Sequence, residues 1–164
     1  MQVSSAHLAA DAMPALSELQ FGLILASHAF ERWMVRCIAA AGVPNLSALD
    51  VLVLHTVHHR GRNKTLADIG LVLNVEDSHV VNYSIKKLVS LGLVTTGRIG
   101  KEKSVAITAK GASVCQKYGD IREELLVNTV KRLQLNENTL SAIAATLRAL
   151  SGNFDQAARA AASL

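Results

Sequence analysis

A change of hydrophobic period partway along the chain limits what it can fold into. Up to residue 90 the apolar residues recur every three or four positions, as they do on one face of a helix. Residues 93–96 and 104–107 are instead rich in β-branched residues and flank a basic segment with two glycines, which indicates a β-hairpin. Helical spacing then returns at Thr108. The expected helices cover about 15–41, 47–59, a short stretch from 65, 76–90, 108–134 and 136–158.

The ends of these helices carry their usual local signals. Thr65-Leu66-Ala67-Asp68 places a carboxylate three residues after a hydroxyl, which is the pattern of a capping box. Gly61 and Gly92 are suitable stops for the helices before them, and Asn136 is a suitable cap for the last helix. A helix, a short helix, a turn, a third helix and a basic hairpin, in this order, make a winged helix-turn-helix. We therefore predict a mainly α fold with a small β-hairpin wing.

The composition agrees with one compact domain and appended helices. Half of the 164 residues are hydrophobic and only 4 % are aromatic, so we exclude a disordered chain and disfavour a β-sandwich. No apolar run reaches the roughly 18 residues needed to cross a bilayer, and the first residues lack the cationic start of a secretory signal. Neither cysteine has the spacing of a metal site or of a disulfide framework. We expect a cytoplasmic protein with no membrane partner, no cofactor and no bound metal.

The positive charge is concentrated at the centre of the chain. The net charge is +4, and residues 61–110 hold 8 Lys and Arg against 4 Asp and Glu, whereas the flanking segments are close to neutral. A basic centre between neutral flanks is typical of a segment that binds a polyanion.

The helix expected at 76–90 has one polar face suited to nucleic acid. With Val81, Ile85, Leu88 and Val89 directed inward, hydrogen-bonding side chains gather on the opposite face. Its asparagine can pair bidentately with adenine, and its hydroxyl, imidazole and phenol groups can reach bases or phosphates. Basic residues of the hairpin would contact the DNA backbone or minor groove and strengthen binding to all sequences alike. The candidate DNA-binding residues are Thr65, Ser78, His79, Asn82, Tyr83 and Lys86, with Arg98, Lys101 and Lys103 on the hairpin.

The order of elements and several short motifs resemble the MarR family of winged helix-turn-helix transcription regulators. The resemblance covers about residues 16–155 and implies a homodimeric, sequence-specific regulator. It would bind a pseudo-palindromic site in double-stranded DNA, with half-sites about one helical turn apart. The matching segments are 66–69 (Leu-Ala-Asp-Ile), 80–82 (Val-Val-Asn), 87–88 (Lys-Leu), 91–94 (Leu-Gly-Leu-Val) and 107–111 (Ile-Thr-Ala-Lys-Gly).

The sequence departs from the family pattern at the wing. Ile99-Gly100-Lys101 stands where the family has an Asp-x-Arg, which predicts a shortened wing that reaches DNA through a lysine or Arg98.

The resemblance also implies how the chain is divided. The outer helices are more apolar than one small winged-helix core can bury, which agrees with a dimer. We expect a flexible N-terminal arm at 1–14, a dimerisation helix at 15–45, the DNA-binding domain at 46–111 and C-terminal dimerisation helices at 112–160.

A small-molecule effector is a further candidate partner. The family's effector crevice lies near a set of residues that would form its walls here, namely Phe30, Trp33, Met34, His55 and His58. His55 and His58 share a helix face, as metal ligands often do, but no Asp, Glu or Cys adjoins them. Structural histidines are therefore favoured, and a metal-responsive regulator is the alternative. Cys37 fits a buried structural thiol better than a peroxide sensor.

Another alternative is a winged-helix module that binds protein without specific DNA binding. Glu76 and Asp77, at the start of the 76–90 helix, would repel phosphate. A positive surface joining that helix to the hairpin would favour DNA, and an apolar or acidic one a protein. No enzyme signature is present, since the sequence lacks a phosphate-binding glycine loop, a nucleophile elbow and a His-Glu-x-x-His motif, and we expect no enzymatic activity.

Overall fold

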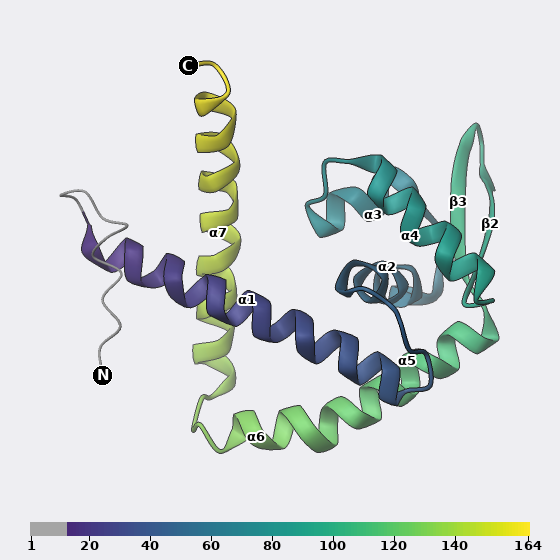
Figure 1. The fold of residues 1–164 in the computed structure, drawn as a ribbon, viewed down its shortest axis with the longest axis horizontal. Coiled ribbons are helices and arrows are strands. Elements are labelled where there is room, and N and C mark those ends of the chain that lie inside the picture. The colour runs from purple at the N-terminus through teal and green to yellow at the C-terminus, as the bar shows by residue number, and fades with distance from the viewer. Residues whose placement is uncertain (1–12) are drawn as a thin grey trace. The chain divides into compact units, whose positions relative to one another are not determined.

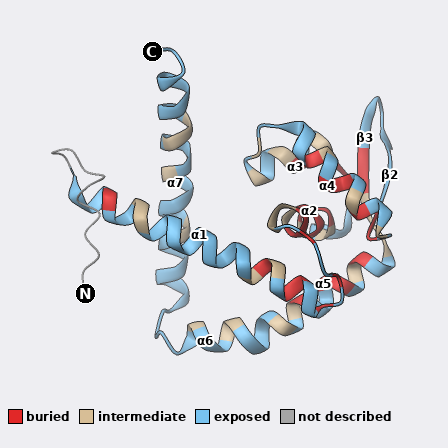
Figure 2. Cartoon of the chain, in the orientation of Figure 1, coloured by how far each residue is buried: buried red, intermediate tan, exposed pale blue. Residues whose placement is uncertain are grey.

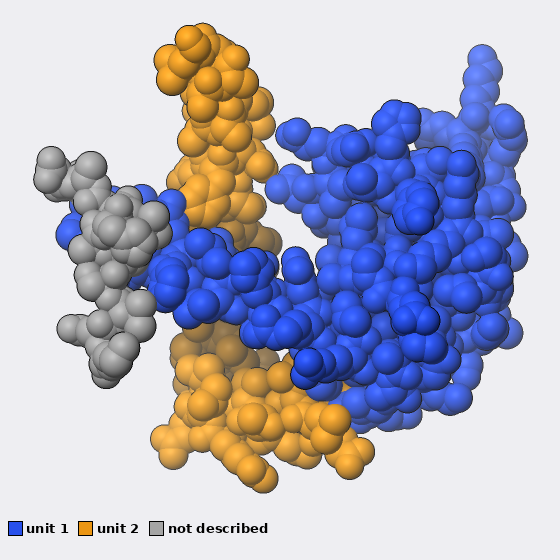
Figure 3. Space-filling view, viewed as in Figure 1, with its two compact units in different colours: residues 1–121 blue, residues 122–164 orange. Residues whose placement is uncertain are grey.

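The computed structural model describes residues 13–164, which form two compact units, one up to residue 121 and one over 122–164 (Figure 3). The expected N-terminal arm lies outside the described residues except for Met13 and Pro14, and Pro14 already begins the first helix.

The first unit contains the predicted helices and hairpin in the predicted order (Figure 1). A proline at the first helical position is favourable, since its missing N–H is one that a helix start leaves unpaired. The helices are α1 (Pro14–Ala40), α2 (Ala48–His58), α3 (Leu66–Leu73), α4 (Ser78–Ser90) and α5 (Ala109–Arg122), the last of which ends at the unit boundary. The strands are β1 (Lys64–Thr65), β2 (Val94–Ile99) and β3 (Glu102–Ile107). The predicted mainly α fold with a β-hairpin wing is confirmed.

The sheet differs from the prediction in two respects. A two-residue strand, β1, pairs antiparallel with the middle of β3, so the strand order is β1-β3-β2. Such a short strand has no periodicity from which the sequence could reveal it. The hairpin strands also run further than expected, so that Ile99 pairs with Glu102 across a two-residue loop. Gly100 opens this loop with a φ of 60°, a conformation that glycine adopts without strain.

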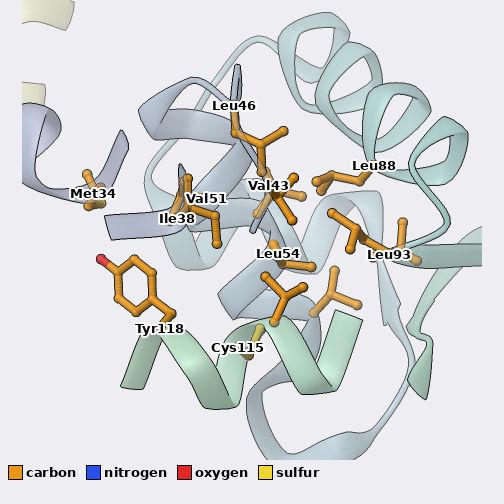
Figure 4. Packing of buried hydrophobic residues seen from close by; sticks show 14 of the residues in the cluster. Met34, Ile38, Val43, Leu46, Val51, Leu54, Leu88, Leu93, Cys115 and Tyr118 are labelled. Atoms are coloured by element: carbon orange, nitrogen blue, oxygen red, sulfur yellow. The ribbon is translucent and has the colours of Figure 1, made fainter. Parts of the chain in front are cut away.

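The core of the first unit lies between α1, α2, α4, the sheet and α5 (Figures 2 and 4). Ile38 of α1 lies beside Val51 of α2, Met34 lies at the edge of the cluster near Tyr118, and Leu88 of α4 and Cys115 of α5 belong to the same cluster. One inward position was predicted wrongly. Val89 is exposed on α4, and Ser84 is buried instead, because the helix turns its 81–84–85–88 stripe toward α2.

The start of α5 crosses the end of α4 at very short range. Thr108 donates its hydroxyl to the carbonyls of Gly92 and Leu93, at 2.7 and 3.0 Å, and accepts the N–H of Gly111 at 3.0 Å. It thereby caps α5 and fastens it to the turn after α4. A Cβ atom on Gly111 would lie 2.1 Å from the carbonyl oxygen of Leu93, so only glycine fits. This contact explains why an Ile-Thr-x-x-Gly sequence follows the hairpin.

The second unit is helical. Helical backbone continues from α5 through a π-helical turn at Glu123–Val127 into α6 (Asn128–Lys131), and α7 follows at Glu137–Ala161. Asn136 caps α7 as predicted, accepting the Thr139 N–H at 2.8 Å. No residue of α7 is buried in the single chain. Over residues 13–164, no helix combines the length and apolar character that crossing a bilayer requires.

Replacement of Gly111 by alanine should destabilise the protein. The added methyl group must displace the Leu93 backbone or the start of α5, at a cost of about 1–3 kcal/mol in the free energy of unfolding. Gly119, on the same helix with open space around it, is the matched control. Gly119→Ala should raise stability by about 0.5–1 kcal/mol because alanine is the better helix former. Urea unfolding of both variants measures the difference, and equal stability would contradict the packing described here.

Candidate nucleic-acid interface

The α4 helix presents one polar face to solvent, as its sequence predicts. Val81, Ile85 and Leu88 are buried, and the opposite face is open. Tyr83 is 73 % exposed, so most of its side chain is open to solvent. Ser78, His79 and Lys86 are likewise exposed, and Asn82 is partly exposed.

A buried carboxylate fixes α4 to α2. Asp50 is 3 % exposed and accepts the Ser84 hydroxyl on one oxygen. Its other oxygen accepts the Lys87 ammonium at 2.9 Å and the Ser47 N–H at 2.8 Å. Lys87 also donates to the Asn45 carbonyl at 2.7 Å. These bonds join the start of α2 to the inner side of α4 and set the position of its outer face.

These bonds also determine the ionisation of Asp50. Burial by itself would raise the pKa of this carboxyl, but the bonds from Ser84, Lys87 and Ser47 more than offset it, so the pKa of Asp50 lies below its ordinary value. Asp50, Ser84 and Lys87 were not among the sequence candidates. The Ser47-x-x-Asp50 capping box is visible in the sequence, but nothing there shows that its carboxylate also reaches α4.

The acidic start of α4 has a structural role. Asp77 caps the helix, accepting the His79 N–H at 2.8 Å. The carboxylate is therefore engaged with the helix N-terminus. Glu76 is exposed beside it.

Thr65 has the weakest structural support among the predicted DNA-binding residues. It is buried, and its hydroxyl accepts the Asp68 N–H at 3.1 Å while the Asp68 carboxylate accepts the Thr65 N–H at 3.0 Å. The predicted capping box at α3 is thus present, and Thr65 is occupied in it. Its two bonds to Asp68 lower the pKa of that carboxyl.

The hairpin adds a pair of cations beside α4 (Figure 1). Arg98 lies directly opposite Lys103 across β2 and β3, so both side chains are on one face of the hairpin. The Lys103 ammonium donates to the amide oxygen of Asn82 at 3.0 Å, which shows that this face is turned toward α4. Lys101 is exposed in the hairpin loop. The structure therefore brings Asn82, Arg98 and Lys103 together.

Not all of the positive charge in the central segment is available to a ligand. Lys64 is buried and donates to the carbonyls of His59 and Arg62 at 2.6 and 2.9 Å; its pKa is lowered, chiefly by burial. Lys110 donates to the Leu91 carbonyl at 2.7 Å. These two lysines and Lys87 thus donate to backbone carbonyls within the domain. The cations that stay exposed belong to the candidate interface.

The proposed effector residues lie in different surroundings. Phe30 is exposed, Met34 is in the core and Trp33 packs against the core. His55 donates its Nδ1–H to the Val51 carbonyl at 2.8 Å and packs edge-on to Tyr118, with ring centroids 4.5 Å apart. Burial is the main reason that the pKa of His55 is lowered. A hollow on α1, about 520 Å³, is instead lined by His28, Glu31, Arg32, Val35 and Arg36 with Ser47 and Ala48 of α2.

Neither the histidines nor the cysteines form a metal site within the described part of the chain. No group of three His, Cys, Asp or Glu side chains lies close enough there to hold an ion. Cys37 and Cys115 are free thiols, and both are buried. Burial raises the pKa of Cys37, and it raises the pKa of Cys115 to about 11. A protonated, buried thiol is a poor nucleophile, which agrees with a structural role for Cys37.

Comparison with known proteins agrees with this geometry. Residues 46–111 match the family described as the winged helix DNA-binding domain. No curated protein sequence is significantly similar to the chain. Among solved structures, mutant MarR from E. coli complexed with operator DNA has a TM-score of 0.67 at 17 % identity, over 86 % of this chain and 99 % of that one.

Two further structures have the same fold. NMB1585, a MarR family regulator from Neisseria meningitidis, has a TM-score of 0.69 at 17 % identity, covering 87 % of this chain and 95 % of that one. Reduced AbfR bound to DNA has a TM-score of 0.68 at 18 % identity, covering 87 % and 96 %. Residues 46–111 thus match a winged helix DNA-binding domain, and the chain has the fold seen in MarR-family regulators. The resemblance seen in the sequence is confirmed in the fold.

Removal of the Asp50 charge should weaken the protein most above acidic pH. Because the pKa of Asp50 is lowered in the fold, its contribution to stability is complete above its unfolded value near 3.9 and is lost as the pH falls through the folded value. Asp50→Asn should reduce the free energy of unfolding at pH 7 by about 1–3 kcal/mol. Below about pH 4, the free energy of unfolding should therefore fall less steeply in the variant than in the wild type.

Asp120→Asn is the matched control, because Asp120 is exposed on α5 and accepts a hydrogen bond from the side-chain amide of Gln116 at 3.0 Å. Denaturant titrations between pH 2.5 and 7 compare the three proteins. A parallel loss of stability at every pH in Asp50→Asn would show that the ionised carboxylate is not what holds α4.

Proposed function

We propose that the protein is a MarR-type transcription regulator that binds a pseudo-palindromic operator in double-stranded DNA as a homodimer. The observation that carries the proposal is the face formed by α4 and the hairpin. There, polar side chains near a helix N-terminus adjoin two cations on one side of the wing. This is the arrangement in which a recognition helix reads a groove and a wing contacts the backbone.

The hairpin cations support a polyanionic partner. Like charges directly opposite one another on a sheet repel and destabilise it, yet Arg98 and Lys103 occupy such a pair. Within the described residues the ion pairs are Lys87–Asp50 and Arg122–Glu123, so neither hairpin cation is neutralised by a carboxylate. A phosphate backbone would relieve this repulsion on binding. The DNA-bound structures of similar fold support the same partner.

The outer helices support a homodimer. The apolar residues of α7, at positions 140, 143, 147, 150 and 154, alternate spacings of three and four, as on the seam of a helix pair. None is buried in the single chain, and α1 likewise exposes Leu25 and Phe30. A second copy of the chain would cover these faces, and Phe21, Leu126 and Val130 are further candidates for the interface.

The protein-binding alternative also has one feature in its favour. Leu71 and Val72 of α3 are 84 % and 67 % exposed, which is unusual for adjacent aliphatic residues. They lie on the helix before the recognition helix, and Leu71 borders a groove of about 410 Å³ between α3 and α4. If purified protein prefers no DNA sequence over random DNA at moderate salt, this surface becomes the candidate interface.

Disruption of the α7 seam should dissociate the dimer. We expect Leu147→Glu to sediment near the 17.5 kDa chain mass at micromolar concentration, and the wild type near twice that mass. Gln156→Glu places the same charge on the opposite face of α7 and should leave the dimer intact. A monomeric wild type would contradict the dimer and remove the reason for a palindromic site.

Removal of the wing-tip charge should weaken binding to every DNA sequence alike. Lys101 is exposed in the hairpin loop, where it can reach phosphates but not base edges in the groove read by α4. Lys101→Ala should therefore reduce the slope of log K against log salt by about one, with sequence preference unchanged. Lys117→Ala, which removes an exposed charge from α5, is the control. Fluorescence anisotropy from 50 to 300 mM salt measures both, and identical slopes would exclude a phosphate contact by Lys101.

A further inference from the structure

A hydrogen bond between the wing and the recognition helix constrains the side chain best placed to read a base. The Lys103 ammonium on β3 lies 3.0 Å from Oδ1 of Asn82 on α4, 21 residues away in the sequence. Arg98 faces Lys103 across the hairpin and repels it, and Glu102, the adjacent residue, points to the other face of the strand. Repulsion by Arg98 therefore favours the conformation in which the Lys103 side chain extends toward α4.

This bond fixes which way the Asn82 amide points. A lysine ammonium has three donors and no acceptor, so only the amide oxygen of Asn82 can face it. The amide NH₂ group is consequently turned away from Lys103. Asparagine normally recognises adenine by accepting from N6 and donating to N7 at the same time, so the N6 amino group must approach the amide oxygen, where the Lys103 ammonium already lies. In the present geometry that oxygen is engaged by a cation.

We infer that Asn82 and Lys103 act as one unit that reads guanine rather than adenine in each half-site. The inference rests on the proposed DNA-binding function and specifies its base preference. Together the amide NH₂ and the ammonium offer only donors. Guanine presents two acceptors in the major groove, N7 and O6, whereas adenine presents N7 beside an amino donor that would meet the ammonium unfavourably. Lys103 is thus a specificity residue, in addition to any contact with phosphate.

The test is selection of oligonucleotides by four proteins, namely the wild type, Lys103→Met, Asn82→Ala and the double variant. Methionine keeps the length of the lysine side chain and removes its donors. The wild type should prefer guanine over adenine at one position per half-site by roughly 5- to 150-fold, the range of one good bidentate contact. Lys103→Met should lose that preference or shift it to adenine at the same position. Asn82→Ala should have no preference there, and adding Lys103→Met should change nothing further.

Lys101→Met is the matched control, because it removes a cation from the same wing without touching Asn82. It should lower affinity and retain guanine at that position. If the wild type selects a site that Lys103→Met reads identically, Lys103 contacts phosphate only and the inference is wrong while the proposed function stands. If the wild type selects no sequence at all, the proposed function fails and the inference with it. Thermal melts of each variant confirm that the exposed substitutions leave the fold intact.

Discussion

The buried carboxylate of Asp50 is the interaction on which the candidate interface depends. It serves two elements at once, since it completes the capping box of α2 and accepts bonds from Ser84 and Lys87 of α4. The Ser84 hydroxyl could not be buried at the helix contact without an acceptor, because an unpaired polar group there would cost more than the contact gains. The α4 helix is therefore positioned by a polar contact within an otherwise apolar core. Its orientation is more specific than apolar packing alone would make it.

The positive charges of the central segment fall into two groups, those bonded inside the domain and those exposed on the hairpin. Three lysines, Lys64, Lys87 and Lys110, donate hydrogen bonds to carbonyls of the domain, and Lys87 also donates to Asp50. Arg98, Lys101 and Lys103 stay on the hairpin, where two of them repel each other. An exposed face that carries several like charges favours binding of a partner of the opposite charge. Because Lys103 also contacts Asn82, that face joins the wing to α4. Under the proposed function, affinity and sequence preference would then share residues.

The sequence was sufficient for most of the fold because its signals are local. The helical spacing, the capping boxes at Ser47 and Thr65, and the glycines after α2 and α4 all act over a few residues. The polar face of α4 could be predicted for the same reason, since residues three and four apart share a face. The exposed position of Val89 and the short strand β1 were missed. Both depend on which neighbour a residue meets, and that neighbour is distant in the sequence.

What the sequence by itself determined is the set of elements and the residue types that α4 and the wing can offer to DNA. Periodicity, caps and turn residues operate within one or two helical turns, so the order helix, helix, helix and hairpin follows from the chain alone. Only the tertiary structure decided which of those side chains are available. It buried Thr65 as a cap, assigned Lys64 and Lys87 to internal bonds, and placed Lys103 against Asn82. Hydrogen bonds between residues 21 to 37 positions apart form only when packing brings their elements together, and no local pattern encodes that distance.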